Sequence, residues 1–167
     1  MSAAALGAAA LIAAAFVTDI RTMRIPNLLT GAGFLLGLGY HGATAGWNGA
    51  GSALAGAAAG FVPLLLLHLM KGIGAGDVKL FGALGAWLGV YETAQLLMYS
   101  ILYAGAIGCI VIAASRPFAR RLWTGIALFI APGRLGMKKE VWNGWAAQGL
   151  KFPFMLAVAP AAVTLWW

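Results

Sequence analysis

The chain has 167 residues, of which 62% are hydrophobic and only 9% are charged. Apolar stretches on this scale exceed what a soluble domain of this size can bury, so the composition excludes an ordinary water-soluble domain and indicates a membrane protein. The formal net charge of +7 does not indicate nucleic-acid binding, because the basic residues flank apolar stretches instead of forming one solvated face.

Hydropathy predicts an all-α, polytopic membrane helix bundle that forms a single domain over residues 1–167. A hydrocarbon core of roughly 30 Å requires about 20 apolar residues per helix. We expect the first apolar stretch to be a retained span, because it has no basic n-region before it and no small-residue cleavage pattern after it. About six spans are predicted by the apolar stretches, at residues 2–18, 27–43, 50–70, 80–91, 94–115 and 152–167.

The basic residues predict the orientation of this bundle. Threading the six spans alternately through a membrane puts all 11 Lys and Arg residues on one side. The positive-inside rule assigns that side to the cytoplasm and both termini to the non-cytoplasmic side. The loop at 116–151 is then cytoplasmic. The basic residues between 116 and 139 either contact acidic lipid headgroups or a partner, or act only as topology signals. Its apolar segment 124–131 is too short to span, and the sequence assigns it no role.

Asp19 and Asp77 are the only aspartates in the chain, and both fall at the cytoplasmic ends of predicted spans. Ionisable groups at membrane depth are costly and are retained mainly where they pair, line a polar cavity or perform chemistry. Two carboxyl groups that face each other share one proton, so together they can act as base and acid. This pattern predicts hydrolysis of the aspartic-protease type, with no metal or other cofactor. The single cysteine, Cys109, excludes a disulfide or a cysteine zinc site within one chain.

Each aspartate also has a structural interpretation. Asp77 could be the N-cap of the helix that follows it. Asp19 lies near a helix C-terminus, where the helix dipole disfavours a carboxylate. A salt bridge to Arg21, Arg24 or Lys79 could compensate for that placement. Other functions open at this point are a small transporter or ion relay, and a non-catalytic membrane protein of pilus or secretion assembly.

A glycine-rich segment, Gly74-Ala75-Gly76-Asp77, precedes the fourth predicted span. Glycine can adopt backbone conformations closed to other residues, and it leaves room for a peptide to approach the carboxylate. Gly74 and Gly76 are therefore expected to shape a peptide channel. Lys79 either holds the Asp77 carboxylate or extends to the membrane interface.

Further polar residues near the pair are candidates for support. Pro26 and Asn27 are expected to start the second helix, since proline suits a first helical turn, and so to fix the loop that follows Asp19. Arg24 either supports the site or only orients the protein. His68 is expected to be a hydrogen-bonded packing residue rather than a member of the site.

Three pairs of glycines lie four residues apart in the apolar stretches, a spacing that lets helix backbones approach closely in lipid. The spacing favours packing within the bundle over dimerisation. These pairs are Gly33 with Gly37, Gly56 with Gly60, and Gly85 with Gly89.

Two motifs together resemble those of the type IV prepilin peptidases, a family of GxGD membrane aspartyl proteases. They are Asp19-Ile20-Arg21 with Arg24-Ile25-Pro26-Asn27, and Gly74-Ala75-Gly76-Asp77-Val78-Lys79-Leu80. The resemblance covers roughly residues 10–115. It implies that Asp19 and Asp77 are the catalytic pair. It also implies cleavage of the leader of prepilin or pseudopilin precursors at the cytoplasmic face of a bacterial or archaeal inner membrane.

Larger members of that family have an extra cytoplasmic region with paired cysteines and also methylate the new N-terminus. This chain, with one cysteine and a short connection between its first two predicted spans, is similar to the small peptidase-only form associated with tight-adherence or Flp pili. The resemblance implies no separate methyltransferase or zinc region. The expected partners are precursor peptides and membrane lipid, without nucleic acid, and the oligomeric state is left open.

Overall fold

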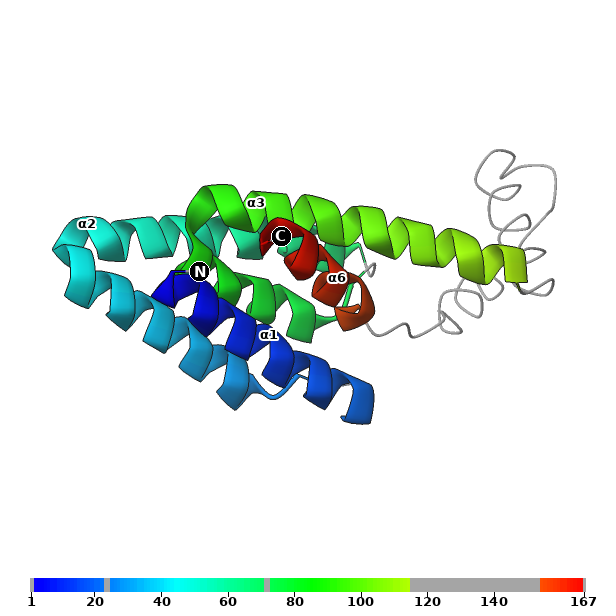
Figure 1. Ribbon diagram of the computed structural model, residues 1–167, viewed down its shortest axis with the longest axis horizontal. Helices are drawn as coiled ribbons and strands as arrows, with labels where there is room; N and C mark the ends of the chain where they lie inside the picture. Colours follow the sequence, from blue (N-terminus) through cyan, green and yellow to red (C-terminus); the bar gives the residue numbers. More distant parts are fainter. Residues whose placement is uncertain (1, 23–24, 71–72, 115–153, 167) are drawn as a thin grey trace. The chain divides into compact units, whose positions relative to one another are not determined.

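The computed structural model describes residues 2–22, 25–70, 73–114 and 154–166 (Figure 1). Nearly all of these residues are helical, and they form α1 (Ala3–Thr22), α2 (Asn27–Leu69), α3 (Ala75–Ala114) and α6 (Met155–Trp166). Three stretches are long and apolar enough to cross a membrane, Ala3–Thr22, Asn27–Leu69 and Ala75–Ile110. The predicted site residue Arg24 and the loop at 116–151 lie outside the described residues.

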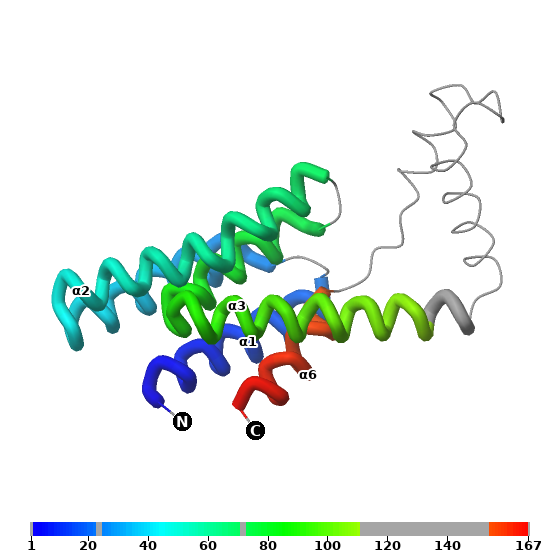
Figure 2. The backbone as a smooth tube through the Cα atoms, turned by 90° about the horizontal axis from the view of Figure 1, so that it is seen from above, coloured from blue at the N-terminus to red at the C-terminus, as the bar shows by residue number. Residues whose placement is uncertain are grey.

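Two glycines interrupt the long helices. Gly46 in α2 has φ 59° and ψ −143°, and Gly89 in α3 has φ 78° and ψ −179°. These angles lie in a region that glycine adopts without a steric penalty. At each break the chain reverses direction, so α2 and α3 each consist of two limbs (Figure 2). The predicted spans 27–43 and 50–70 fall on the two limbs of α2. In α3 the chain breaks at Gly89, a few residues before the boundary at residues 92–93 that separates the predicted spans 80–91 and 94–115. The count of six spans and the sides of the termini stay predictions.

The first limb of α3 is the centre of the compact unit formed by Met1–Ala104 and Pro153–Trp167. A helix that is apolar on all sides is typical of such a central position. Buried side chains occur around its whole circumference, at Val78, Leu80, Phe81, Ala83, Leu84 and Ala86. A second unit, Gly105–Phe152, is described only as far as Ala114. The single domain over residues 1–167 therefore stays a prediction.

Glycines bring the second limb of α2 against this central limb. A Cβ atom added at Gly56 would collide with the backbone of Gly85 and Gly89, and one added at Gly85 would collide with the carbonyl of Gly56. Gly60 lies against the carbonyl of Phe81 in the same way. At these positions the glycines serve close packing of helices within the bundle, as their spacing predicted.

Trp87 joins the first limb of α2 to the end of the central limb. Its indole Nε1–H donates to the carbonyl oxygen of Gly33 at 2.8 Å, and its ring stacks on Tyr40 with centroids 5.7 Å apart. The Nε2 atom of His41 lies 3.0 Å from the carbonyl oxygen of Trp87, two residues before the break in α3. His41 therefore has a structural partner at this end of the limb, about 15 Å along the helix axis from Asp77.

Candidate active site

Asp19 lies in the last turn of α1, on the face that packs into the bundle. The buried residues Ala5, Ala8, Ile12 and Ala15 precede it at alternating spacings of three and four, which mark one side of a helix. The Asp19 side chain is only 7% exposed, and its Oδ2 atom is buried with no hydrogen-bond partner among the described residues. A buried, unpartnered carboxyl oxygen is costly. This atom is therefore a candidate for contacting water or substrate.

The beginning of α6 compensates for the unfavourable position of Asp19 at the end of α1. The backbone N–H of Met155, the first residue of α6, donates a hydrogen bond to the Asp19 carboxyl group. The first amides of a helix have no partner inside the helix, and their partial positive charge favours a carboxylate. The sequence suggested that a salt bridge offsets the unfavourable helix dipole at Asp19. In the structure, the hydrogen bond from the Met155 amide has this role.

Asp77 is the third residue of α3, which begins at Ala75. Gly74 occupies the N-cap position, because its carbonyl oxygen accepts the first helical hydrogen bond from Val78 N at 3.4 Å. The Asp77 carboxyl group in turn accepts a hydrogen bond from the backbone amide of Gly74. A side chain in the first turn thus reaches back to the cap residue, as in a capping box. The interpretation of Asp77 as the N-cap itself is wrong, because the helix starts before it.

The two carboxyl groups lie close enough for mutual electrostatic repulsion. Apolar residues next to the site, Ala15, Val78 and Met155, belong to one buried cluster. The end of α1, the beginning of α3 and the beginning of α6 thus come together here (Figure 1). The structure brings together the two aspartates that the sequence selected.

Gly74 and Gly76 have ordinary backbone conformations. Among the described residues, positive φ angles occur only at the two glycines that break α2 and α3, so Gly74 and Gly76 do not use the conformational freedom of glycine. Their role in shaping a peptide channel stays a prediction. What matters at Gly74 is the missing side chain, because an added Cβ would lie 3.2 Å from Asp77 Oδ2. At Gly76 an added Cβ would lie 3.4 Å from the Cβ of Ile25, so the connection between α1 and α2 occupies the space there.

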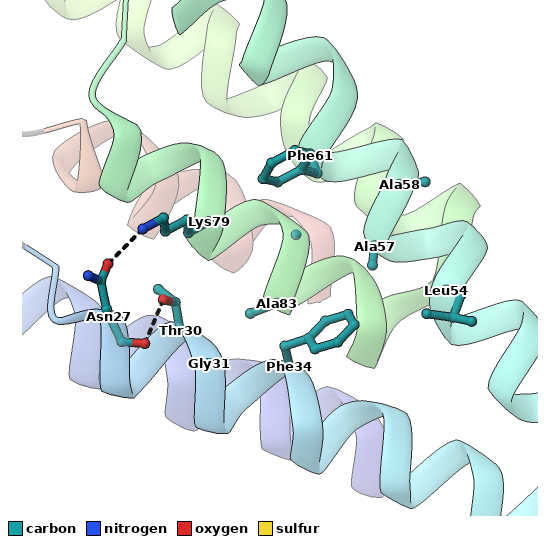
Figure 3. Close-up of a pocket in the computed structure, with 11 residues that line it drawn as sticks. Asn27, Thr30, Gly31, Phe34, Leu54, Ala57, Ala58, Phe61, Lys79 and Ala83 are labelled. Carbon is teal, nitrogen blue, oxygen red and sulfur yellow. Dashed lines mark hydrogen bonds between the residues drawn. The ribbon is translucent and has the colours of Figure 1, made fainter.

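Lys79 contacts Asn27 rather than an aspartate. Its Nζ donates to Asn27 Oδ1 at 2.9 Å and so joins the start of α3 to the start of α2 (Figure 3). Of the two predicted roles for Lys79, holding the Asp77 carboxylate is therefore not observed. Pro26 lies at the N-cap position of α2, with φ −61° and ψ 134°, and Asn27 is the first helical residue. This placement differs by one residue from a proline inside the first turn.

A pocket of about 440 Å³ lies between the two limbs of α2 and the first limb of α3 (Figure 3). The polar groups of Asn27, Thr30 and Lys79 line one part of it. The rest of the wall is apolar and includes Phe34, Leu54, Ala57, Phe61, Gly82 and Ala83. Lys79 follows Asp77 by two residues, so the polar end begins about 3 Å along the helix axis from the Asp77 backbone.

His68, near the end of α2, has the hydrogen bond expected of it. Its Nδ1 atom lies 2.7 Å from the carbonyl oxygen of Ile73. A carbonyl can only accept, so the ring nitrogen is the donor.

Sequence reasoning missed the Met155 amide, because a backbone donor leaves no residue-type signal. The His68 contact could have been suspected from its position just before the segment that contains Asp77.

Comparisons with known proteins agree with these motifs. The family model described as the type IV leader peptidase family matches residues 5–112. A curated relative from Bacillus subtilis (strain 168), named prepilin leader peptidase/N-methyltransferase, is 34% identical over 123 residues, which cover 71% of this chain and 48% of the relative. The chain thus spans about half the length of that relative. No solved structure matches the chain. The chain belongs to the type IV leader peptidase family.

Proposed function

We propose that the protein is a membrane aspartyl endopeptidase that removes the leader peptide of type IV prepilin or pseudopilin precursors. The observation that carries the proposal is the juxtaposition of two carboxyl groups, Asp19 and Asp77, at the meeting point of three helix ends. The buried Asp19 Oδ2 without a partner among the described residues supports a reactive role over a structural one.

In the proposed reaction the two carboxyl groups share one proton, because two adjacent negative charges repel each other. The ionised aspartate removes a proton from a water molecule as that water attacks the scissile carbonyl carbon. The protonated aspartate donates its proton to the carbonyl oxygen, which gives a tetrahedral intermediate without a covalent bond to the enzyme. The newly protonated aspartate then donates its proton to the peptide nitrogen, while the other carboxylate removes a proton from a hydroxyl group of the intermediate. The C–N bond breaks, and the pair returns to its starting state.

Backbone amides fix both carboxyl groups in this scheme. Met155 N–H holds Asp19 and Gly74 N–H holds Asp77, and both amides belong to helix N-termini. Such donors are preorganised, because the helices hold them in place before substrate binds. Small displacements of catalytic groups are costly for rate, so this fixation has direct kinetic value.

The apolar pocket is proposed to take apolar residues of the precursor that flank the scissile bond. The polar end of the pocket lies within one helical turn of Asp77 along the axis of α3, although side chains two residues apart lie on different faces of a helix. Lys79 and Asn27, at this end, can hydrogen-bond to the backbone of the bound segment. Apolar walls with a few polar groups are typical of sites that bind a ligand in one orientation.

Orientation and substrate type belong to the same proposal. The distribution of Lys and Arg favours a multi-pass protein of the inner membrane whose aspartates face the cytoplasm. Flp-type precursors are the proposed substrates, from the resemblance to the small peptidase-only form. The methyltransferase activity named for the Bacillus subtilis relative is not part of the proposal.

The proposal is tested by co-expression of the protein with a Flp-type precursor. Leader removal is compared for the native chain, Asp19→Asn, Asp77→Asn and Glu92→Gln, with each protein quantified in membranes. Glu92 is exposed on α3 and provides a matched loss of one carboxylate away from the site. Uncut precursor with both aspartate variants and full processing with Glu92→Gln is the expected result. Native processing by either aspartate variant would overturn the mechanism.

A further inference from the structure

We propose that His68 is a positioning residue for Asp77 and acts through the peptide group between Ile73 and Gly74. The inference rests on the proposed peptidase function and concerns a residue that neither sequence motif contains. His68 lies near the end of α2, whereas Asp77 lies in the first turn of α3. Ile73 and Gly74 directly precede α3 and so lie next to the turn that contains Asp77.

A single peptide group has hydrogen bonds on both of its sides. The His68 Nδ1–H donates to the Ile73 carbonyl oxygen at 2.7 Å. The amide of the same peptide group, Gly74 N–H, donates to the Asp77 carboxyl group. A trans peptide group is planar, with its C=O and N–H pointing in opposite directions, and the described residues contain no cis peptide bond. Fixing the oxygen therefore fixes the direction in which the N–H points.

The hydrogen bond to the Ile73 oxygen acts directly before a glycine. Glycine restricts the backbone less than any other residue, so the side chain of residue 74 does not itself orient this peptide group. A hydrogen bond to the Ile73 oxygen also polarises the Gly74 N–H, because linked hydrogen bonds strengthen one another by roughly 10–30%. The Asp77 carboxyl group packs closely on this peptide, since a Cβ at Gly74 would lie 3.2 Å from its Oδ2. A change at His68 is thus transmitted to the carboxyl group through a single peptide plane.

The alternative is that His68 only ties two parts of the backbone together. The chain contains a matched control for that role, because His41 also contacts a backbone carbonyl, that of Trp87 at 3.0 Å. Both histidines lie in α2, and both contacts join α2 to residues further along the chain. Loss of either contact affects folding, but only loss of the His68 contact is expected to affect the chemical step.

The experiment measures kcat and KM of the full-length purified protein on a synthetic Flp-type precursor peptide. The variants are His68→Leu, His68→Asn and His41→Leu, each checked for its melting temperature in the same detergent. Asparagine retains an amide donor near the place of the histidine Nδ1. We expect His68→Leu to lower kcat by about tenfold, the equivalent of one hydrogen bond, with KM changed less than about twofold. We expect His68→Asn to recover most of kcat and His41→Leu to keep it.

Three results would overturn the inference. They are a native kcat in His68→Leu, an equal loss in His68→Leu and His68→Asn, and an equal loss in His41→Leu. If His68→Leu does not accumulate, His68→Phe takes its place, because phenylalanine keeps an aromatic ring but has no hydrogen-bond donor. A native kcat in His68→Phe would then overturn the inference. If the native protein leaves the precursor uncut, the proposed function itself is refuted. If the native protein is active and the His68 variants have native kcat, only the inference about His68 is refuted.

Discussion

Replacing Gly74 with alanine places a methyl group against the Asp77 carboxyl group, which we propose to be catalytic. The added Cβ would lie 3.2 Å from Asp77 Oδ2, which is closer than most non-bonded contacts of a Cβ atom. The carboxyl group must move by a few tenths of an ångström. This movement also strains the hydrogen bond that the carboxyl group accepts from the Gly74 amide. A displacement of 1 Å can cost about 100-fold in rate, so a third of that displacement corresponds to a loss of about fivefold in kcat.

Gly76→Ala is the matched control for this prediction. Its added Cβ would meet Ile25 at 3.4 Å, an ordinary contact with an apolar side chain, so we expect kcat within about twofold of the native value. The assay is cleavage of a synthetic precursor at saturating concentration by purified protein. A native kcat for Gly74→Ala, or a larger loss for Gly76→Ala, would refute the account of how the glycines serve the site.

Four further substitutions test the bundle and the pocket. Gly56→Ala is expected to destabilise the protein by about 1–3 kcal/mol, because the new methyl group collides with the opposite helix. Gly31→Ala, which meets nothing within 4 Å, should not lower the melting temperature in detergent. Trp87→Phe keeps an aromatic ring but removes the donor to the Gly33 carbonyl, and a loss of about 1 kcal/mol in unfolding free energy is expected. Phe34→Ala removes part of the apolar pocket wall. It should raise KM with little change in kcat, since it weakens ground-state and transition-state binding alike.

Sequence reasoning located the helices and the two aspartates for physical reasons. Long apolar stretches require helices in a membrane. Only four acidic residues occur in the chain, so an aspartate at the end of an apolar stretch stands out. Asp19 also continues the buried stripe of α1, but the sequence does not mark that stripe, because nearly every residue of this helix before Thr18 is apolar.

Other features of the site could not be read in this way. The donors to Asp19 and Asp77 are backbone amides, and any residue at Met155 or Gly74 would offer the same group. The glycine motif suggested unusual backbone angles, but at Gly74 the structure uses the lack of a side chain. Glycine also occurs at many positions inside the limbs, so residue type alone does not distinguish Gly46 and Gly89 as the residues with positive φ.

The most direct test of the central claim is a double-mutant comparison of the two aspartates. Single-turnover cleavage of a synthetic precursor is measured for Asp19→Asn, Asp77→Asn and the double variant in the same lipid vesicles. Groups that act as one catalytic unit are non-additive, so each single variant should lose about as much rate as the double variant. If the losses multiply, or if one single variant retains substantial cleavage, the two carboxyl groups do not form a catalytic pair.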